Sequence, residues 1–205
     1  WACLEGLVEV VKRLINHNVK LEMKDDNGRT PLHWACEYGH DKVVKILIDR
    51  KVKLNEKDYW DQLTPLHLAC RQGHTEVVKL LIDRNVKLNE KDEEGQTPLH
   101  RACQNGHTDI VQLLVKQGAQ LEEKNEGGQT PLHFACSWGH AEIVKLLVKE
   151  QVKLEEKDKR GLTASHWACL NGHKEVVNLL SQSKRLNLEE TDSRGNTVFH
   201  FAVKR

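Results

Sequence analysis

The sequence predicts an all-α fold, a solenoid built from repeated pairs of short helices, and two spacings indicate it. Six cysteines, each preceded by alanine, are separated by 33 or 34 residues, and a Thr-Pro-Leu-His motif recurs at the same period. The cysteines are Cys3, Cys36, Cys70, Cys103, Cys136 and Cys169. The motif starts at Thr30, Thr64, Thr97 and Thr130, with altered copies at Thr163 and Thr197. Such a period is typical of stacked repeats, in which every unit copies the same positions.

Each unit is expected to begin with a short helix. Thr30 is a favourable N-cap, and Pro31 suits the first helical position, where its missing N–H costs nothing. We therefore expect a helix over 31–38. It ends at Gly39, because glycine accepts the left-handed conformation that a helix C-terminus requires.

A second helix is expected over 41–49. Its apolar residues cover more than one face, so neighbouring units must cover it on both sides. The alternating stretch from Val52 to Leu54 leads to a turn at Asp58 and predicts an extended finger. One pair of short helices buries too little surface to fold alone, so the core must come from stacking.

The Thr-Pro-Leu-His-x-Ala motif at this period resembles that of ankyrin repeats, and the resemblance covers the whole chain. It implies an ankyrin-repeat α-solenoid with β-hairpin-like fingers and with its first helices along a concave face. Residues 1–205 then form a single array, which we expect to be part of a longer array or protein because both ends fall within a repeat. Full repeats are expected at 25–57, 58–91, 92–124, 125–157 and 158–191, and partial repeats at 1–24 and 192–205.

Charge and cysteine usage exclude several classes of partner. Lysine plus arginine (31) nearly balances aspartate plus glutamate (30), and no basic block is present, so we expect neither nucleic-acid binding nor attraction to an acidic membrane surface. Apolar runs are too short for membrane insertion. Cysteines on stacked units lie beyond disulfide reach. Six thiols then favour an intracellular setting, cytoplasmic or nuclear, and we expect a monomeric array.

The twelve histidines invite a catalytic or metal-binding interpretation, but eleven of them follow the repeat. The resemblance implies that the motif histidine ties its threonine to nearby backbone by hydrogen bonds. A pair such as His33 and Cys36 supplies only two of the ligands that zinc needs. No nucleophile, phosphate-binding or zinc-protease motif is present. We expect no enzymatic activity, no cofactor and no metal.

Residues that vary while the frame is constant are the candidate partner contacts. The resemblance places them at finger tips and at the ends of first helices. Tyr59 and Trp60 stand out on a finger that is one residue longer than the others, because exposed aromatics near arginine are typical of binding hot spots. The candidate partner-binding residues are Arg29, Tyr38, Tyr59, Trp60, Leu63, Arg71, Gln72, Trp138, Lys159 and Arg160. Trp34, Phe134 and Trp167 follow the motif histidine and are expected to fill the core.

The leading hypothesis is a scaffold that binds a partner protein or peptide on its concave face and finger tips. A narrower alternative is an aromatic cage for a methylated lysine, formed by Tyr38, Tyr59 and Trp60 with Glu37 and Asp61 nearby. A third is a targeting or mechanical segment of a larger channel, ligase, chromatin enzyme or toxin.

The repeats from Asp158 onward are predicted to fray first. Ser165 stands where the other full repeats have leucine, and a hydroxyl at an apolar site costs about 1–3 kcal/mol unless it finds a partner. Amide hydrogen exchange should therefore be fastest in this segment, and slowest exchange there would contradict the prediction.

Overall fold

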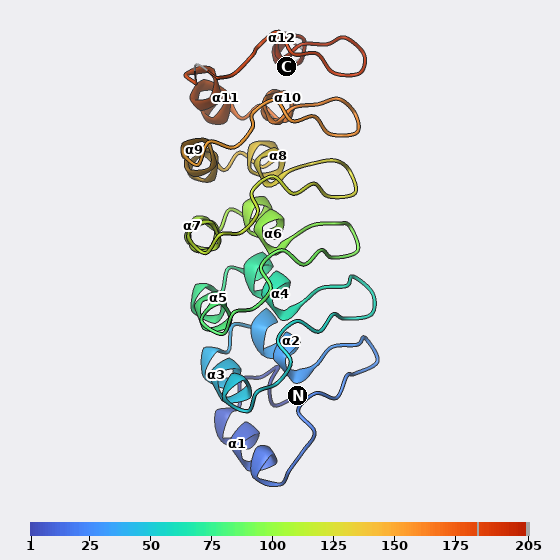
Figure 1. Cartoon of the computed structure of the whole chain (residues 1–205), viewed down its shortest axis with the longest axis vertical. Coiled ribbons are helices and arrows are strands. Elements are labelled where there is room, and N and C mark those ends of the chain that lie inside the picture. Colours follow the sequence, from blue (N-terminus) through green and yellow to red (C-terminus); the bar gives the residue numbers. More distant parts are fainter. Residues whose placement is uncertain (184, 204–205) are drawn as a thin grey trace. The chain divides into compact units, whose positions relative to one another are not determined.

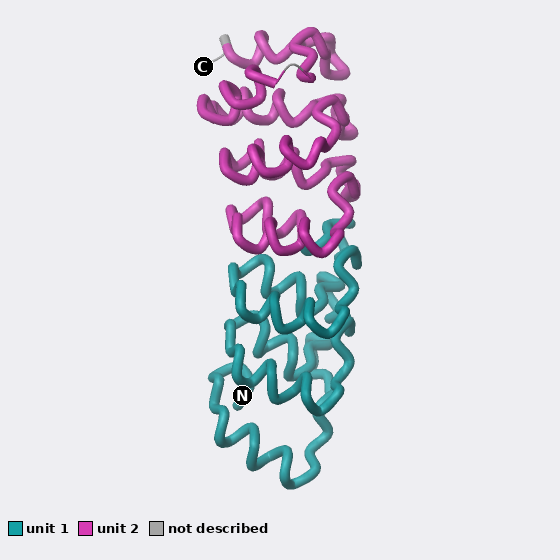
Figure 2. The backbone as a smooth tube through the Cα atoms, turned by 60° about the vertical axis from the view of Figure 1, so that its left-hand side comes forward, with its two compact units in different colours: residues 1–98 teal, residues 99–205 magenta. Residues whose placement is uncertain are grey.

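A computed structural model describes residues 1–183 and 185–203 (Figure 1). Residues 184, 204 and 205, which belong to the expected repeats 158–191 and 192–205, lie outside the described residues. The chain divides into two compact units, residues 1–98 and 99–205 (Figure 2).

The first unit stacks helix pairs in two columns, with finger loops on the side away from the second helices (Figure 1). Helix α2 packs against α4, and α3 packs against both α1 and α5. The helices are α1 (Val8–Asn16), α2 (Pro31–Glu37), α3 (Asp41–Asp49), α4 (Pro65–Gln72) and α5 (Thr75–Ile82).

The second unit repeats the arrangement. Helix α8 packs against α10, α10 against α12, and α9 against both α7 and α11. Helix α6 (Pro98–Gln104) starts at the last residue of the first unit. The others are α7 (Thr108–Lys116), α8 (Pro131–Ser137), α9 (Ala141–Lys149), α10 (Ala164–Leu170), α11 (Lys174–Ser181) and α12 (Val198–Val203).

The ends of the helices follow the caps that the sequence predicts. Thr30 is the N-cap of α2 and Pro31 its first residue, and α3 spans the expected 41–49, whereas α2 ends at Glu37, one residue early. Gly39 has φ +74°, and a Cβ there would lie 2.5 Å from the Nδ1 atom of His74. Glycine is therefore needed both for the turn and for the contact with the next repeat.

The motif histidine joins its own helix to the following finger. The Nδ1 atom of His33 accepts from the Thr30 backbone N–H at 3.1 Å and lies 2.8 Å from Thr30 Oγ1, while Nε2 donates to the Leu63 carbonyl at 3.1 Å. Only a neutral ring with its proton on Nε2 satisfies these partners. The same link to the next finger is made by His67, His133 and His166. The structural role expected for this histidine is confirmed.

The β-hairpin character expected of the fingers is not confirmed. The residues that the structure describes hold no strand, only an isolated bridge between Thr191 and Thr197. In the finger that starts at Asp58, the Asp58 N–H donates to the Leu63 carbonyl at 3.0 Å, but the Leu63 N–H donates to Asp58 Oδ1 at 2.9 Å. The Leu63 N–H would donate to the Asp58 backbone carbonyl in a β-hairpin, but here the Asp58 carboxylate accepts it instead.

Lysine side chains connect successive fingers along their outer arms. Lys24 Nζ donates to the Lys57 carbonyl at 2.9 Å and pairs with Glu56 at 3.1 Å. The hydrogen bond that Lys24 donates to the Glu56 carboxylate, together with the charge of Lys24, holds the pKa of Glu56 below its usual value. Equivalent bonds to a backbone carbonyl of the next finger come from Lys57, Lys124 and Lys157.

Three core expectations meet different outcomes. Phe134 is buried, as expected, whereas Trp34 and Trp167 are only half-buried. Each indole N–H donates at 2.9 Å to an aspartate of its own finger, which holds the ring at the surface. Ser165 is buried, but its hydroxyl lies 2.8 Å from Thr163 Oγ1 and so finds the partner that lowers its cost.

The cysteines are thiols, and all except Cys3 are buried. Burial raises the pKa of Cys36, Cys70 and Cys136 well above the usual range of a thiol. In the described part of the chain, no helix combines the length and apolar character needed to cross a bilayer.

The motif histidines predict a loss of stability in mild acid. Burial lowers the pKa of His33, His133 and His166 below the ordinary 6.5. Below about pH 6.5 the unfolded chain therefore binds protons that the folded chain does not. The free energy of unfolding then decreases as the pH is lowered, by at most about 1.4 kcal/mol per pH unit for each histidine. The urea midpoint should be lower at about pH 5 than at about pH 7.5. An unchanged midpoint would contradict the neutral-histidine assignment.

Candidate partner-binding surface

The finger tips of the first unit are joined backbone to backbone. Tyr59 N–H donates to the Asn27 carbonyl at 2.9 Å, and Glu93 N–H donates to the Asp61 carbonyl at 2.8 Å. Three tips, residues 25–29, 58–63 and 92–96, therefore form one continuous set, named here the fingertip row. Gly28 has φ +77°, and a Cβ there would lie 2.5 Å from the ring of Tyr59.

Two aromatic side chains project from the middle of this row. Trp60 is 70% exposed and Tyr59 57% exposed. Lys24 Nζ lies 5.2 Å from the centroid of the Tyr59 ring. Gln62 replaces the usual glycine at φ +54°, and its amide donates to the carbonyls of Asp58 and Tyr59 at 3.1 and 3.3 Å. The longer finger is thus fixed by its own turn.

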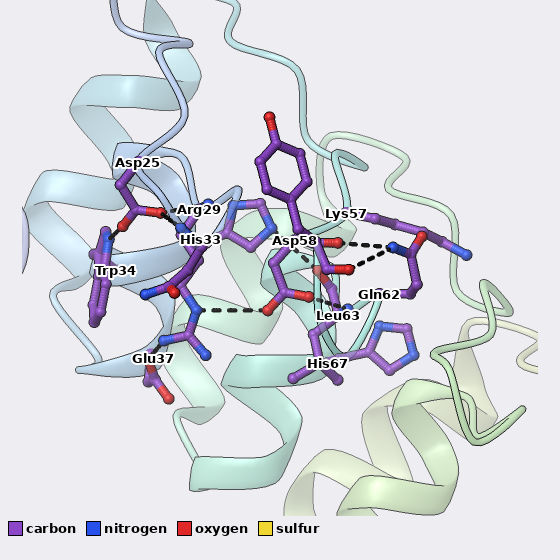
Figure 3. Close-up of polar contacts among 12 residues, drawn as sticks. Asp25, Arg29, His33, Trp34, Glu37, Lys57, Asp58, Gln62, Leu63 and His67 are labelled. Atoms are coloured by element: carbon purple, nitrogen blue, oxygen red, sulfur yellow. Dashed lines mark hydrogen bonds and ion pairs between the residues drawn. The ribbon is translucent and has the colours of Figure 1, made fainter.

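Glu37 bridges two arginines, Arg29 and Arg71, and Figure 3 shows it beside the first of them. Its carboxylate accepts from Arg29 at 2.6 Å and from Arg71 at 2.8 Å, and its side chain is only 12% exposed. The Arg29 guanidinium also lies 4.8 Å from the centroid of the Trp34 ring and 3.5 Å from a carboxylate oxygen of Asp58. Both arginines are therefore bound within the unit, and Glu37, which the sequence did not mark as their anchor, positions them.

The other candidates of the first unit have different surroundings. Leu63 is 1% exposed, so its assignment as a partner contact is wrong. Leu63 lies at the base of its finger, where its backbone carbonyl accepts a hydrogen bond from His33. The residue that makes this finger longer than the others therefore extends the tip, and Leu63 stays at the buried base. Gln72, the last residue of α4, is exposed. Tyr38 is 51% exposed and stacks on Trp34 with ring centroids 6.3 Å apart.

The candidates of the second unit lie on a helix end and on a finger. Trp138 follows α8 and is 56% exposed. Lys159 and Arg160 are exposed, and the Arg160 guanidinium lies 5.2 Å from the centroid of the Trp167 ring. Their finger is held by Lys159 N–H, which donates to the Gly127 carbonyl at 2.9 Å.

A family model for ankyrin repeats, described as three copies, matches residues 1–58, 51–125, 121–192 and 149–205. The chain belongs to the ankyrin-repeat family. A search of curated proteins gives no match. Ankyrin repeats generally act as protein–protein interaction modules, so the exposed residues of this ankyrin array are candidates for partner contacts.

His33 and Cys36, the repeated histidine and cysteine of α2, are both buried in the packing of these ankyrin repeats. Both ring nitrogens of His33 are engaged in hydrogen bonds, and the raised pKa of the Cys36 thiol opposes formation of a nucleophilic thiolate. Among the described residues, no group of three or more His, Cys, Asp or Glu side chains is arranged to hold a metal ion.

The methyl-lysine cage is not favoured by the position of its members. The Glu37 carboxylate, which would face the bound cation, is already held by Arg29 and Arg71. The ring of Tyr38 packs between Trp34 and His40, with centroids 6.3 and 6.4 Å away. These contacts leave Tyr59 and Trp60 as the projecting aromatics of the fingertip row.

The Glu37 bridge predicts a large cost for removing one carboxylate. Glu37→Gln leaves Arg29 and Arg71, both largely buried, without their anion, and should destabilise the chain by about 1–3 kcal/mol in urea unfolding. Asp49→Asn is the control, because it breaks the exposed Asp49–Arg84 pair and should change stability by less than about 0.5 kcal/mol. Equal effects of the two variants would contradict the anchoring role.

Proposed function

We propose that the chain is a non-catalytic protein-interaction module whose partner contacts the fingertip row. The observation that carries the proposal is the exposure of Tyr59 and Trp60 on a fixed finger. Large exposed aromatics are unfavourable in water unless a partner covers them, and rigid aromatics lose little entropy on binding. Tyr38 and Gln72 extend the proposed surface along the ends of α2 and α4.

Arg29 and Arg71 support this surface through their shared anion. Because Glu37 holds both guanidinium groups, they position the base of the row and the ends of α2 and α4. On the second unit, Trp138, Lys159 and Arg160 are the residues that we assign to a partner.

We also propose repeat boundaries at 25–57, 58–91, 92–124, 125–157 and 158–191, with partial repeats at 1–24 and 192–205. Their support is that each full segment contains one first helix and one second helix, from α2 and α3 to α10 and α11. We further propose that a single array with these boundaries acts inside the cell, in the cytoplasm or the nucleus; its support is that five of the six cysteines are buried thiols.

The test is the joint change Tyr59→Ala and Trp60→Ala. Partners captured on the wild-type chain are identified, and the Kd of each is then measured by calorimetry. The double variant should weaken binding by about 2 kcal/mol, or roughly thirtyfold, because the ring contacts are lost. Its urea midpoint should stay unchanged, since both side chains are exposed.

Phe199→Ala is the matched control for non-specific apolar binding, because Phe199 is 71% exposed on α12 and lies outside the fingertip row. Affinity that survives the double variant, or that falls equally in the control, would remove Tyr59 and Trp60 as the anchor.

A further inference from the structure

A pocket of about 300 Å³ lies between two finger tips of the second unit, residues 158–162 and 192–196. The two tips are joined backbone to backbone, because the Ser193 N–H donates to the Arg160 carbonyl at 3.3 Å. The volume is at the lower end of the range of ligand pockets, so the pocket suits one side chain of a partner better than a large ligand.

Three cationic side chains line this pocket, those of Lys159, Arg160 and Arg194. All three residues are exposed. Among the described residues none of these side chains forms an ion pair, although the Arg160 guanidinium lies 5.2 Å from the centroid of the Trp167 ring. Because like charges repel one another, bringing three cations to one pocket is unfavourable until an anion joins them.

The aspartates of these two fingers are engaged elsewhere. Asp192 Oδ1 accepts from the backbone N–H groups of Arg194 and Asn196 at 2.9 and 2.8 Å, and its Oδ2 accepts from the Asn196 side-chain amide at 3.0 Å. Both oxygens of Asp158 are likewise taken by N–H groups of its own repeat. The two carboxylates lower the local net charge but form no ion pair with the cations of the pocket.

The cations of the pocket are not part of the repeated frame. At the positions of Lys159 and Arg160, the first full repeat has Asp26 and Asn27, and its finger closes in the same way through Asp25. The fold therefore does not require positive charge at these two positions, which leaves binding as the reason for it.

The remaining walls of the pocket add a donor and an apolar surface. The Ser193 hydroxyl has no hydrogen-bond partner within the part of the chain that the structure describes. A hydroxyl can donate to an anionic oxygen beside the cations. Phe201, which is half-buried on α12, forms part of the wall and can cover the hydrocarbon stem of a bound side chain.

We infer that this pocket binds an acidic side chain of a partner protein, a carboxylate or the phosphate of a phosphorylated residue. The inference rests on the part of the proposed function that assigns Lys159 and Arg160 to a partner, and it names the chemistry of that partner. The ammonium and guanidinium groups donate charge-assisted hydrogen bonds to the anionic oxygens. The Ser193 hydroxyl donates one more, and the stem of the acidic side chain packs on Phe201.

A protein segment fits this pocket better than a nucleic acid. The whole chain has a net charge of +1, and the neighbouring finger, residues 125–129, carries the exposed carboxylate of Glu126. That finger is joined to the pocket's first tip through the bond from the Lys159 N–H to the Gly127 carbonyl. The positive surface thus ends there and offers no extended basic track for a phosphate backbone.

The test uses the full chain and a fluorescein-labelled peptide in which glutamate alternates with glycine. Matched peptides carry phosphoserine or glutamine in place of glutamate, and binding is followed by fluorescence anisotropy. At least one acidic peptide should bind about tenfold more tightly than the glutamine peptide, and raising NaCl from about 50 to about 300 mM should weaken it severalfold. The acidic peptide that binds more tightly identifies the source of the anion.

Charge variants locate the binding. The combined change Lys159→Gln, Arg160→Gln and Arg194→Gln should weaken the acidic peptides by about tenfold or more. The matched control removes three exposed cations of α7 and α9 outside the pocket: Lys116→Gln, Lys145→Gln and Lys149→Gln. Because it changes the net charge equally, it should alter affinity by less than about twofold. Urea midpoints verify that both variants remain folded.

Equal binding of the acidic and glutamine peptides overturns the inference, as does equal behaviour of the two charge variants. A single-stranded oligonucleotide of matched charge that binds more tightly than both acidic peptides, and is lost in the pocket variant, overturns the protein partner. The Tyr59 and Trp60 variant should bind the acidic peptides as the wild-type chain does. If that variant loses the captured partner while all peptides bind equally, the fingertip row stands and only the pocket is removed.

Discussion

A hydrogen-bonded histidine between one helix pair and the next finger is the constraint on which the rest of the structure depends. His33 caps its own helix through Thr30 and binds the Leu63 carbonyl of the following repeat. Both hydrogen bonds need a neutral imidazole ring. The helix cap and the stacking of one repeat on the next therefore depend on the same protonation state of His33. Because that link fixes the base of each finger, the tip can change in sequence without disturbing the core.

The separation of frame and tip explains where specificity resides. Asp58 closes its finger through the carboxylate and Gln62 fixes the turn, so Tyr59 and Trp60 stand on a backbone that is already ordered. Preorganisation of this kind reduces the entropy lost when a partner binds. Glu37 adds to it from behind the row, because one carboxylate immobilises two arginines that belong to successive repeats.

The sequence predicted features that depend on local chemistry. Thr30, Pro31 and Gly39 define where a helix starts and stops, and the period of the motif defines the family. Features that depend on which side chains meet in the folded chain were not predictable. Leu63 varies between repeats as a contact residue would, yet its backbone carbonyl places it in the core. Trp34 follows a buried histidine, but a hydrogen bond to Asp25 keeps it half-exposed.

The lysine links have a direction that bears on how such a chain can lengthen. Lys24 and Lys57 donate forward, and the acceptor is always a main-chain carbonyl, which any amino acid provides. A duplicated repeat would therefore contain both a lysine that donates to the next repeat and a backbone carbonyl that accepts from the lysine of the previous repeat. Neither group depends on the side chains at the finger tip. Gene duplication can add such modules without simultaneous changes on both sides of the new junction.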